Sequence, residues 1–146
     1  MKVAKVEIQL HQRSRSSSEA VIRHHRVPVD RPAEKGGEDT GPMGGELFLA
    51  AIGGCFMSTL LAAIRTREAA ISDVSAKVTG ILADAPARFE RIELLVTAGD
   101  ADREAFEKLV EIAERGCIMM NTLRDKIEVR VGISRDTDRR RTEIVV

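Results

Sequence analysis

The chain has 146 residues, of which 43% are hydrophobic, so it is long enough for one domain with a buried core. Lysine plus arginine and aspartate plus glutamate both number 23, which gives a formal net charge of zero. Nucleic-acid-binding proteins carry basic surfaces and aromatic rings that stack on bases. The charge balance, with only four phenylalanines as aromatics, therefore argues against that class. We expect a single domain over residues 1–146.

Residues 1–30 predict an N-terminal β-hairpin. Apolar and polar residues alternate over 2–10, as in a half-buried strand, and 19–29 predicts a second strand. The short polar turn between them makes the two strands antiparallel. This N-terminal stretch lacks the apolar core of a signal peptide, so we expect a cytoplasmic protein.

Two features near the end of this hairpin concern function. His24 and His25 are adjacent, so on a strand they face opposite ways and cannot share a metal ion. We therefore expect no metal site. Residues 31–45 are rich in glycine and proline and predict a loop, which either leads into the following helix or carries charged groups such as Arg31 towards Cys55.

The most distinctive segment is an uncharged run from Leu47 to Ile64, with Cys55 at its centre. It predicts a central helix over 46–69. A helix this apolar has no face suited to water, so it either crosses a membrane or is buried in protein. The run is shorter than the ~20 apolar residues of a membrane span, so we favour burial and expect no membrane association. One small domain cannot cover it on all sides, whereas a homodimer with two such helices packed together can.

Residues 72–133 predict a hairpin, a helix and a strand. Alternation over 72–84 and 88–98 gives the hairpin, with its turn at Ala85-Pro86. An apolar stripe over 102–115, after an N-capping Asp102, gives the helix.

Cys117 follows that helix and precedes a short helical turn over 118–124 and a last strand over 126–133. The tail, 134–146, is mostly polar, and we expect its Arg139–Arg141 run to be solvated. The order of elements predicts an α+β fold of antiparallel β-hairpins around a long buried central helix.

Two motifs carry a family resemblance. They are GGEDTGPMGGELFLAAIGGCFMSTL (36–60) and GCIMMNTLRDKIEV (116–129). In order and spacing they resemble the OsmC/Ohr family of osmotically induced and organic-hydroperoxide-resistance proteins. The resemblance spans residues 19–133 and is stronger to the OsmC-like branch than to the peroxidases. It implies the OsmC-like fold and an intertwined homodimer with two long central helices back to back.

The resemblance also implies a thiol-dependent (hydro)peroxidase, an antioxidant oxidoreductase that needs no cofactor. Cys55 would be the redox-active cysteine whose thiolate attacks the O–O bond of an organic hydroperoxide and becomes a sulfenic acid. Cys117 would condense with it to a disulfide, which an external dithiol reductant would reduce by exchange.

In the family's peroxidases an arginine, oriented by a glutamate on the long helix, offsets the cost of ionising the buried cysteine. By position Arg31 is the candidate arginine, with Arg26 behind it, and Glu46 is the candidate acid. Gly45 stands where the peroxidases have their acid. At about 100° per residue, the nine residues from Glu46 to Cys55 (55 − 46 = 9) place the two on opposite sides of a regular helix. Glu46 also suits a helix N-terminus, where a carboxylate complements the dipole.

Two functional hypotheses follow. The pair Cys55 and Cys117 favours the peroxidase, although a buried cysteine is more often an inert small hydrophobe. The glycine at 45 favours the alternative, a non-peroxidatic OsmC-like protein that binds a small apolar or electrophilic ligand at the dimer cleft. Ile118 replaces the proline that usually follows the family's second cysteine, a change that alters the local turn and keeps the thiol.

Overall fold

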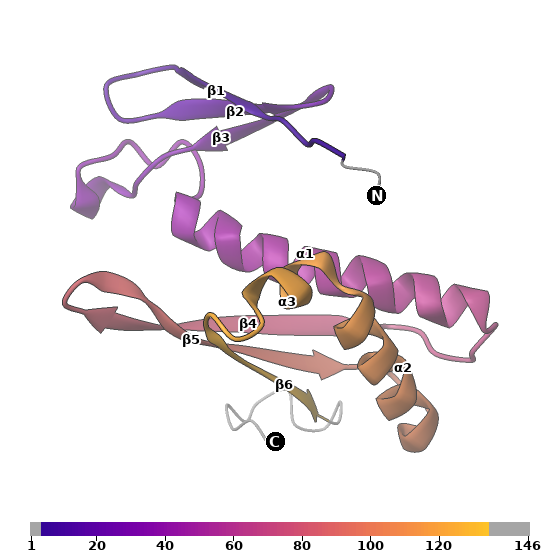
Figure 1. The fold of residues 1–146 in the computed structure, drawn as a ribbon. Helices are drawn as coiled ribbons and strands as arrows, with labels where there is room; N and C mark the ends of the chain where they lie inside the picture. The colour runs from indigo at the N-terminus through magenta and orange to yellow at the C-terminus, as the bar shows by residue number, and fades with distance from the viewer. Residues whose placement is uncertain (1–3, 135–146) are drawn as a thin grey trace. The chain divides into compact units, whose positions relative to one another are not determined.

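The computed structural model describes residues 4–134 and divides them into two units, which meet between Phe48 and Leu49 (Figure 1). The long helix α1 (Gly44–Thr66) begins in the first unit and continues in the second. The expected tail, with its Arg139–Arg141 run, lies outside the described residues. One domain over 1–146 stays a prediction.

The first unit contains a three-stranded antiparallel sheet instead of the expected two-stranded hairpin. Its order is β1-β2-β3, with β1 (Gln9–Gln12), β2 (Ser18–Ile22) and β3 (His25–Val29). The expected strand over 2–10 begins only at Gln9, which pairs with Val21 near the end of β2. Residues before Gln9 have little of β2 left to pair with, so Val6 is 92% exposed.

The expected strand over 19–29 is wrong because the chain reverses in its middle. Arg23 adopts a left-handed φ of 55°, and with His24 it forms the turn between β2 and β3. His24 therefore lies in a turn, not on a strand. Its ring centroid is 4.0 Å from that of His25, so the two rings do not face opposite ways as predicted.

The second unit contains the sheet β4-β5-β6. The hairpin of β4 (Ser75–Asp84) and β5 (Ala87–Thr97) is confirmed, as are the predicted helix, α2 (Arg103–Gly116), and the helical turn, α3 (Ile118–Leu123). The last strand, β6 (Glu128–Ser134), pairs with β5 in parallel, which the expectation of antiparallel hairpins did not include. A parallel pair needs a long crossover, and α2 and α3 supply it.

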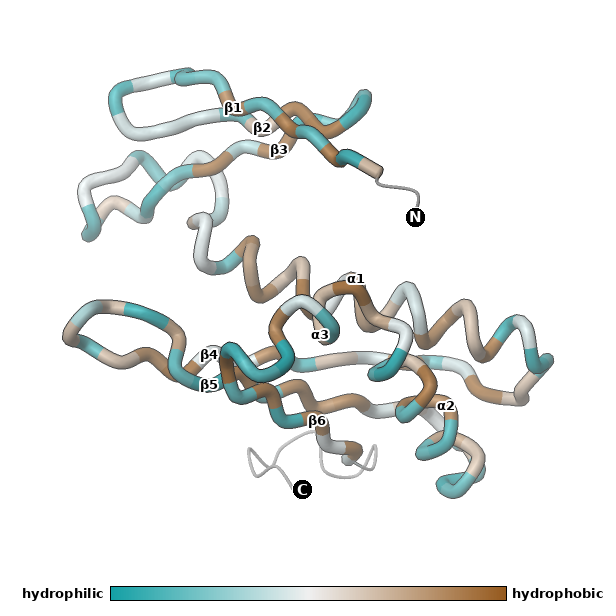
Figure 2. Tube along the Cα trace, in the orientation of Figure 1, coloured by the Kyte–Doolittle hydropathy of each residue, from teal (hydrophilic) through white to brown (hydrophobic). Residues whose placement is uncertain are grey.

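One face of α1 packs into the core of the second unit. Ile52, Phe56 and Leu60 recur every four residues and are fully buried. Gly53 lets α1 approach β4 closely, because a Cβ added at this position would lie only 2.8 Å from the Val78 side chain. Figure 2 shows α1 brown to white over most of its length, with charged residues near its two ends. The sheet supplies Ile92, Leu94 and Val96, and α2 supplies Phe106, Leu109, Val110 and Ala113.

A second face of α1 stays exposed in the single chain. It carries small or apolar residues at helical spacing: Ala50, Ala51, Gly54, Ser58 and Leu61. This exposed face fits the expectation that one small domain cannot cover the helix on all sides, while the homodimer that would bury it stays a prediction. Among the described residues, α1 is the one helix whose length and apolar composition would suffice to cross a membrane, but its packed face is that of a core helix.

Two leucines of the same sheet provide a test of this core. Leu94 on β5 is fully buried, whereas Leu82 on β4 is 66% exposed. We expect Leu94→Ala to lower the free energy of unfolding by about 2–5 kcal/mol, because it removes buried apolar volume. The control, Leu82→Ala, should change it by at most about 0.5 kcal/mol. Urea unfolding followed by circular dichroism measures both, and equal effects would contradict the assigned core.

Candidate functional site

The two cysteines predicted as a redox pair meet in the second unit. Cys55 lies in the middle of α1, and Cys117 lies between α2 and α3. Their Sγ atoms are 3.3 Å apart, and the Cys117 thiol donates a hydrogen bond to Cys55 Sγ. Both are free thiols, with Cys55 partly exposed and Cys117 fully buried.

The break between α2 and α3 positions Cys117. α2 ends at Gly116, and Cys117 adopts an extended conformation (φ −78°, ψ 123°) that starts α3 in a new direction. A Cβ on Gly116 would lie 3.3 Å from the methyl group of Thr59, so glycine lets the end of α2 approach α1 closely. This approach places the second thiol beside Cys55, one helical turn before Thr59.

Backbone N–H groups at the start of α3 influence the ionisation of both thiols. The Asn121 N–H donates to the Cys117 carbonyl at 3.0 Å, the first bond of the helix. The preceding amides have no helix carbonyl to bond. The N–H groups of Ile118 and Met119 favour the Cys55 thiolate and those of Met119 and Met120 favour a Cys117 thiolate, although the Cys117 side chain accepts no capping hydrogen bond. The first turn of α3 thus favours the charged form of each thiol.

These surroundings shift the two thiols in opposite directions. Burial raises the pKa of Cys55, but the N–H of Met119, the Cys117 thiol and the N–H of Ile118 outweigh it and lower that pKa. Burial also raises the pKa of Cys117; the N–H groups of Met120 and Met119 oppose this, but hydrogen bonding and charge from Cys55 add to the rise. Cys55 is therefore the first of the pair to ionise.

Sequence reasoning looked for a cation to stabilise Cys55 and missed these backbone donors. The signal for them was present in Gly116-Cys117, which separates two predicted helical segments. A helix that starts directly after a cysteine has free N–H groups next to that thiol.

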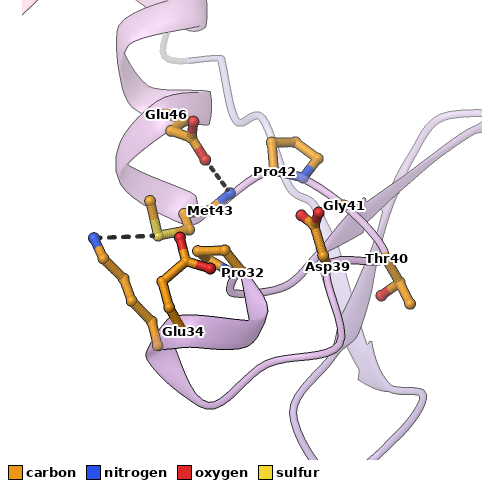
Figure 3. A pocket seen from close by; sticks show the side chains of 9 residues that line it. Pro32, Glu34, Asp39, Thr40, Gly41, Pro42, Met43 and Glu46 are labelled. Atoms are coloured by element: carbon orange, nitrogen blue, oxygen red, sulfur yellow. Dashed lines mark hydrogen bonds between the residues drawn. The ribbon is translucent and has the colours of Figure 1, made fainter.

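Arg31 and Glu46, the other predicted site residues, belong to the first unit, so their action on Cys55 stays a prediction. Arg31 is exposed and precedes a 3-10 turn, η1 (Ala33–Lys35). Glu46 accepts the Met43 N–H at 2.9 Å, which gives it the role of a cap at the start of α1 (Figure 3).

The loop that carries Arg31 is ordered by the buried carboxylate of Asp30, which is 3% exposed. One oxygen accepts the Arg31 N–H at 2.7 Å; the other accepts the N–H groups of Glu38 (3.2 Å) and Thr40 (3.1 Å) and the Thr40 hydroxyl (2.8 Å). Burial raises the pKa of Asp30, but the donors led by Thr40 hold it well below its usual range. The ionised Asp30 carboxylate therefore holds the loop in one conformation through these hydrogen bonds, and we call it the Asp30 hub.

Two open hollows lie along this loop. One of about 570 Å³ is lined by charged residues, among them Glu34, Lys35 and Glu46 (Figure 3). The other, of about 550 Å³, lies beside Arg31 and the start of α1. Within residues 4–134, no group of three or more His, Cys, Asp or Glu side chains could hold a metal ion.

The opposite pKa shifts generate a test with iodoacetamide, which reacts with thiolates. We expect Cys55 to be alkylated first, with a midpoint in the pH–rate profile below the ordinary ~8.5, because its thiolate is stabilised. The rate should fall as pH drops through that midpoint. Cys117 should react more slowly and with a higher midpoint. Mass spectrometry of quenched peptides measures both sites, and unfolding in guanidinium should make their midpoints equal. Faster alkylation of Cys117 in the folded protein would contradict this order.

Comparisons with known proteins agree with this fold and these motifs. A family model described as OsmC-like protein matches residues 36–132. An OsmC-like protein from Mycoplasma pneumoniae is similar in structure, with 17% identity, TM-score 0.79, and coverage of 90% of this chain and 97% of that one. An organic hydroperoxide resistance protein from Elizabethkingia anophelis is 25% identical, with TM-score 0.69 and coverage of 93% and 100%. No curated protein sequence matches. The chain belongs to the OsmC-like protein family.

Proposed function

We propose that the protein is a thiol-dependent peroxidase that reduces organic hydroperoxides, with Cys55 as the attacking and Cys117 as the resolving residue. The observation that carries the proposal is the pair of sulfurs 3.3 Å apart with opposite pKa shifts. A peroxidatic cysteine must ionise and be accessible to the peroxide. A resolving thiol must lie beside it and stay protonated until the sulfenic acid has formed. The partial exposure of Cys55 and the full burial of Cys117 support that division.

In the first step, the Cys55 thiolate attacks the terminal oxygen of the hydroperoxide and the O–O bond breaks. The alkoxide leaves and takes a proton from water to become the alcohol, and Cys55 becomes a sulfenic acid. In the second step, the sulfur of Cys117 loses its proton and attacks Cys55. The S–OH bond breaks, hydroxide takes up a proton as water, and a disulfide forms. Two exchanges with an external dithiol restore both thiols.

The first step prepares the second. Hydrogen bonding and charge from Cys55 raise the pKa of Cys117 while Cys55 is a thiolate. The sulfenic acid is uncharged, so that repulsion ends once peroxide has been reduced. The N–H groups of Met119 and Met120 then favour the Cys117 thiolate. Cys117 is thereby kept protonated until its nucleophilicity is needed.

The family supports this chemistry. Structural neighbours with the names of organic hydroperoxide resistance proteins come from Elizabethkingia anophelis and Bacillus subtilis. The apolar surroundings of Cys55 on α1 suit an organic peroxide, and free thiols suit a reducing, cytoplasmic location. Arg31 is the proposed cation for the bound peroxide, with Glu46 as its candidate acid.

A peroxidase assay tests the proposal. With cumene hydroperoxide and a dithiol, we expect catalytic peroxide loss that Cys55→Ser abolishes, because serine cannot form the sulfenic acid. Cys117→Ser should still reduce one equivalent of peroxide and then accumulate a sulfenic acid that dimedone traps. Mass spectrometry identifies the adduct on Cys55. If Cys55 stays reduced under excess peroxide, the peroxidase proposal is wrong.

The alternative is a non-peroxidatic protein that binds a small apolar or electrophilic ligand, and the glycine at position 45, where the peroxidases have an acid, favours it. A low-pKa thiolate reacts with electrophiles as well as with peroxides. Under this alternative, Cys55 would be alkylated rapidly by an electrophile such as N-ethylmaleimide and would stay reduced in peroxide.

We also propose a homodimer, because α1 exposes an uncharged face that water solvates poorly. Leu61 on this face is 47% exposed. We expect light scattering to give twice the chain mass, and Leu61→Asp to shift the protein towards monomer by placing charge in the interface. Leu82→Asp, which changes an exposed leucine on β4, is the matched control and should leave the dimer intact. A wild-type monomer at micromolar concentration would refute the dimer.

A further inference from the structure

Gly116, the last residue of α2, is not required there by its backbone conformation. Glycine often ends a helix because it adopts a left-handed φ. Among the glycines of residues 4–134, only Gly36 has a positive φ, and alanine would be the better helix former at position 116. The neighbour that requires a glycine is Thr59 on α1, whose methyl group would lie 3.3 Å from an added Cβ.

Thr59 holds that methyl group in a fixed orientation. Its hydroxyl donates a hydrogen bond to the Cys55 carbonyl at 3.0 Å, one helical turn earlier. A β-branched side chain is stiff in a helix, and this bond holds Thr59 in the rotamer whose methyl group faces Gly116. Two successive turns of α1 thus carry the Cys55 thiol and the methyl group against which α2 ends.

Two adjacent contacts therefore join the end of α2 to α1. One is the hydrogen bond between the thiols of Cys117 and Cys55, and the other is the approach of Gly116 to Thr59. We propose that Gly116 and Thr59 are positioning residues, which together set how closely Cys117 can approach Cys55. This deepens the proposed function and rests on it, because the distance matters most when the two sulfurs form the disulfide of the proposed cycle.

The contact acts differently on the two oxidation states. The Sγ atoms are 3.3 Å apart in the dithiol, whereas a disulfide holds its sulfurs about 2.05 Å apart. A Cβ at position 116 would force Thr59 or the end of α2 to yield slightly. The dithiol accommodates that shift, because two hydrogen-bonded thiols can lie further apart, but a covalent bond cannot lengthen. Gly116→Ala therefore strains the disulfide more than the dithiol.

The test is the equilibrium of the whole protein with glutathione. Two electrons and two thiol protons pass from Cys55 and Cys117 to glutathione disulfide, which becomes two glutathione molecules. Mass spectrometry after acid quenching and alkylation measures the fraction of each form. We expect Gly116→Ala to lower the equilibrium constant for disulfide formation about tenfold, because an added methyl group overpacks the contact. The matched control is Gly44→Ala, whose Cβ meets nothing within 4 Å, and it should equal wild type. Equal constants in Gly116→Ala and Gly44→Ala would overturn the proposal.

A second substitution assigns the effect to Thr59. Thr59→Ser removes the methyl group and keeps the hydroxyl, so combined with Gly116→Ala it should restore the constant to within about twofold of Thr59→Ser alone. A double variant as deficient as Gly116→Ala would overturn the proposal. If Gly116→Ala does not fold by circular dichroism, the double variant still decides: a folded double variant about tenfold below Thr59→Ser would refute the contact.

The readout separates this proposal from the peroxidase. Glutathione disulfide replaces peroxide as the oxidant, so a shift in Gly116→Ala with rescue by Thr59→Ser would support the positioning role even in a protein that reduces no hydroperoxide. Conversely, active peroxide turnover with an unshifted glutathione equilibrium in Gly116→Ala would retain the proposed function and reject the positioning role.

Discussion

The site depends on one physical constraint: a negative sulfur in an apolar helix needs hydrogen-bond donors in place of water. Burial alone raises the pKa of both cysteines. α1 cannot supply donors to Cys55 from its own interior, because its N–H groups are used within the helix. The Cys117 thiol donates one hydrogen bond, and the N–H groups of Met119 and Ile118 at the start of α3 also lower the pKa of Cys55. The chain must therefore bring a helix start to the middle of α1.

The architecture of the second unit provides that start. After β5, the chain forms α2, breaks at Gly116-Cys117 and begins α3 before it returns as the parallel strand β6. A hairpin from β5 would have ended in a short turn and would have placed no helix there. The crossover between β5 and the parallel strand β6 thus also carries Cys117 and the start of α3 to the thiol site.

Much of this could be predicted from the sequence, because it depends on local patterns. The uncharged run from Leu47 to Ile64 predicted α1, periodicity predicted α2 and the β4–β5 hairpin, and the two motifs predicted the cysteine pair. Apart from the Cys117 thiol, the groups that lower the pKa of Cys55 are backbone N–H groups, which no side-chain pattern in the sequence predicts. The turn at Arg23 was missed because a non-glycine residue takes a left-handed φ there. The Asp30 hub was missed because its partners, from Arg31 to Thr40, are mostly backbone amides.

The unequal exposure of the two thiols also decides how the proposed disulfide would be reopened. Cys117 Sγ is fully enclosed, while Cys55 is partly open to solvent. A reductant would therefore attack the sulfur of Cys55, and the mixed disulfide would form there. Cys117 would depart as the leaving thiolate, which the N–H groups of Met120 and Met119 favour. In the proposed cycle, the oxidant and the reductant would thus both react at the same exposed sulfur, so the surface around Cys55 would decide the specificity for each.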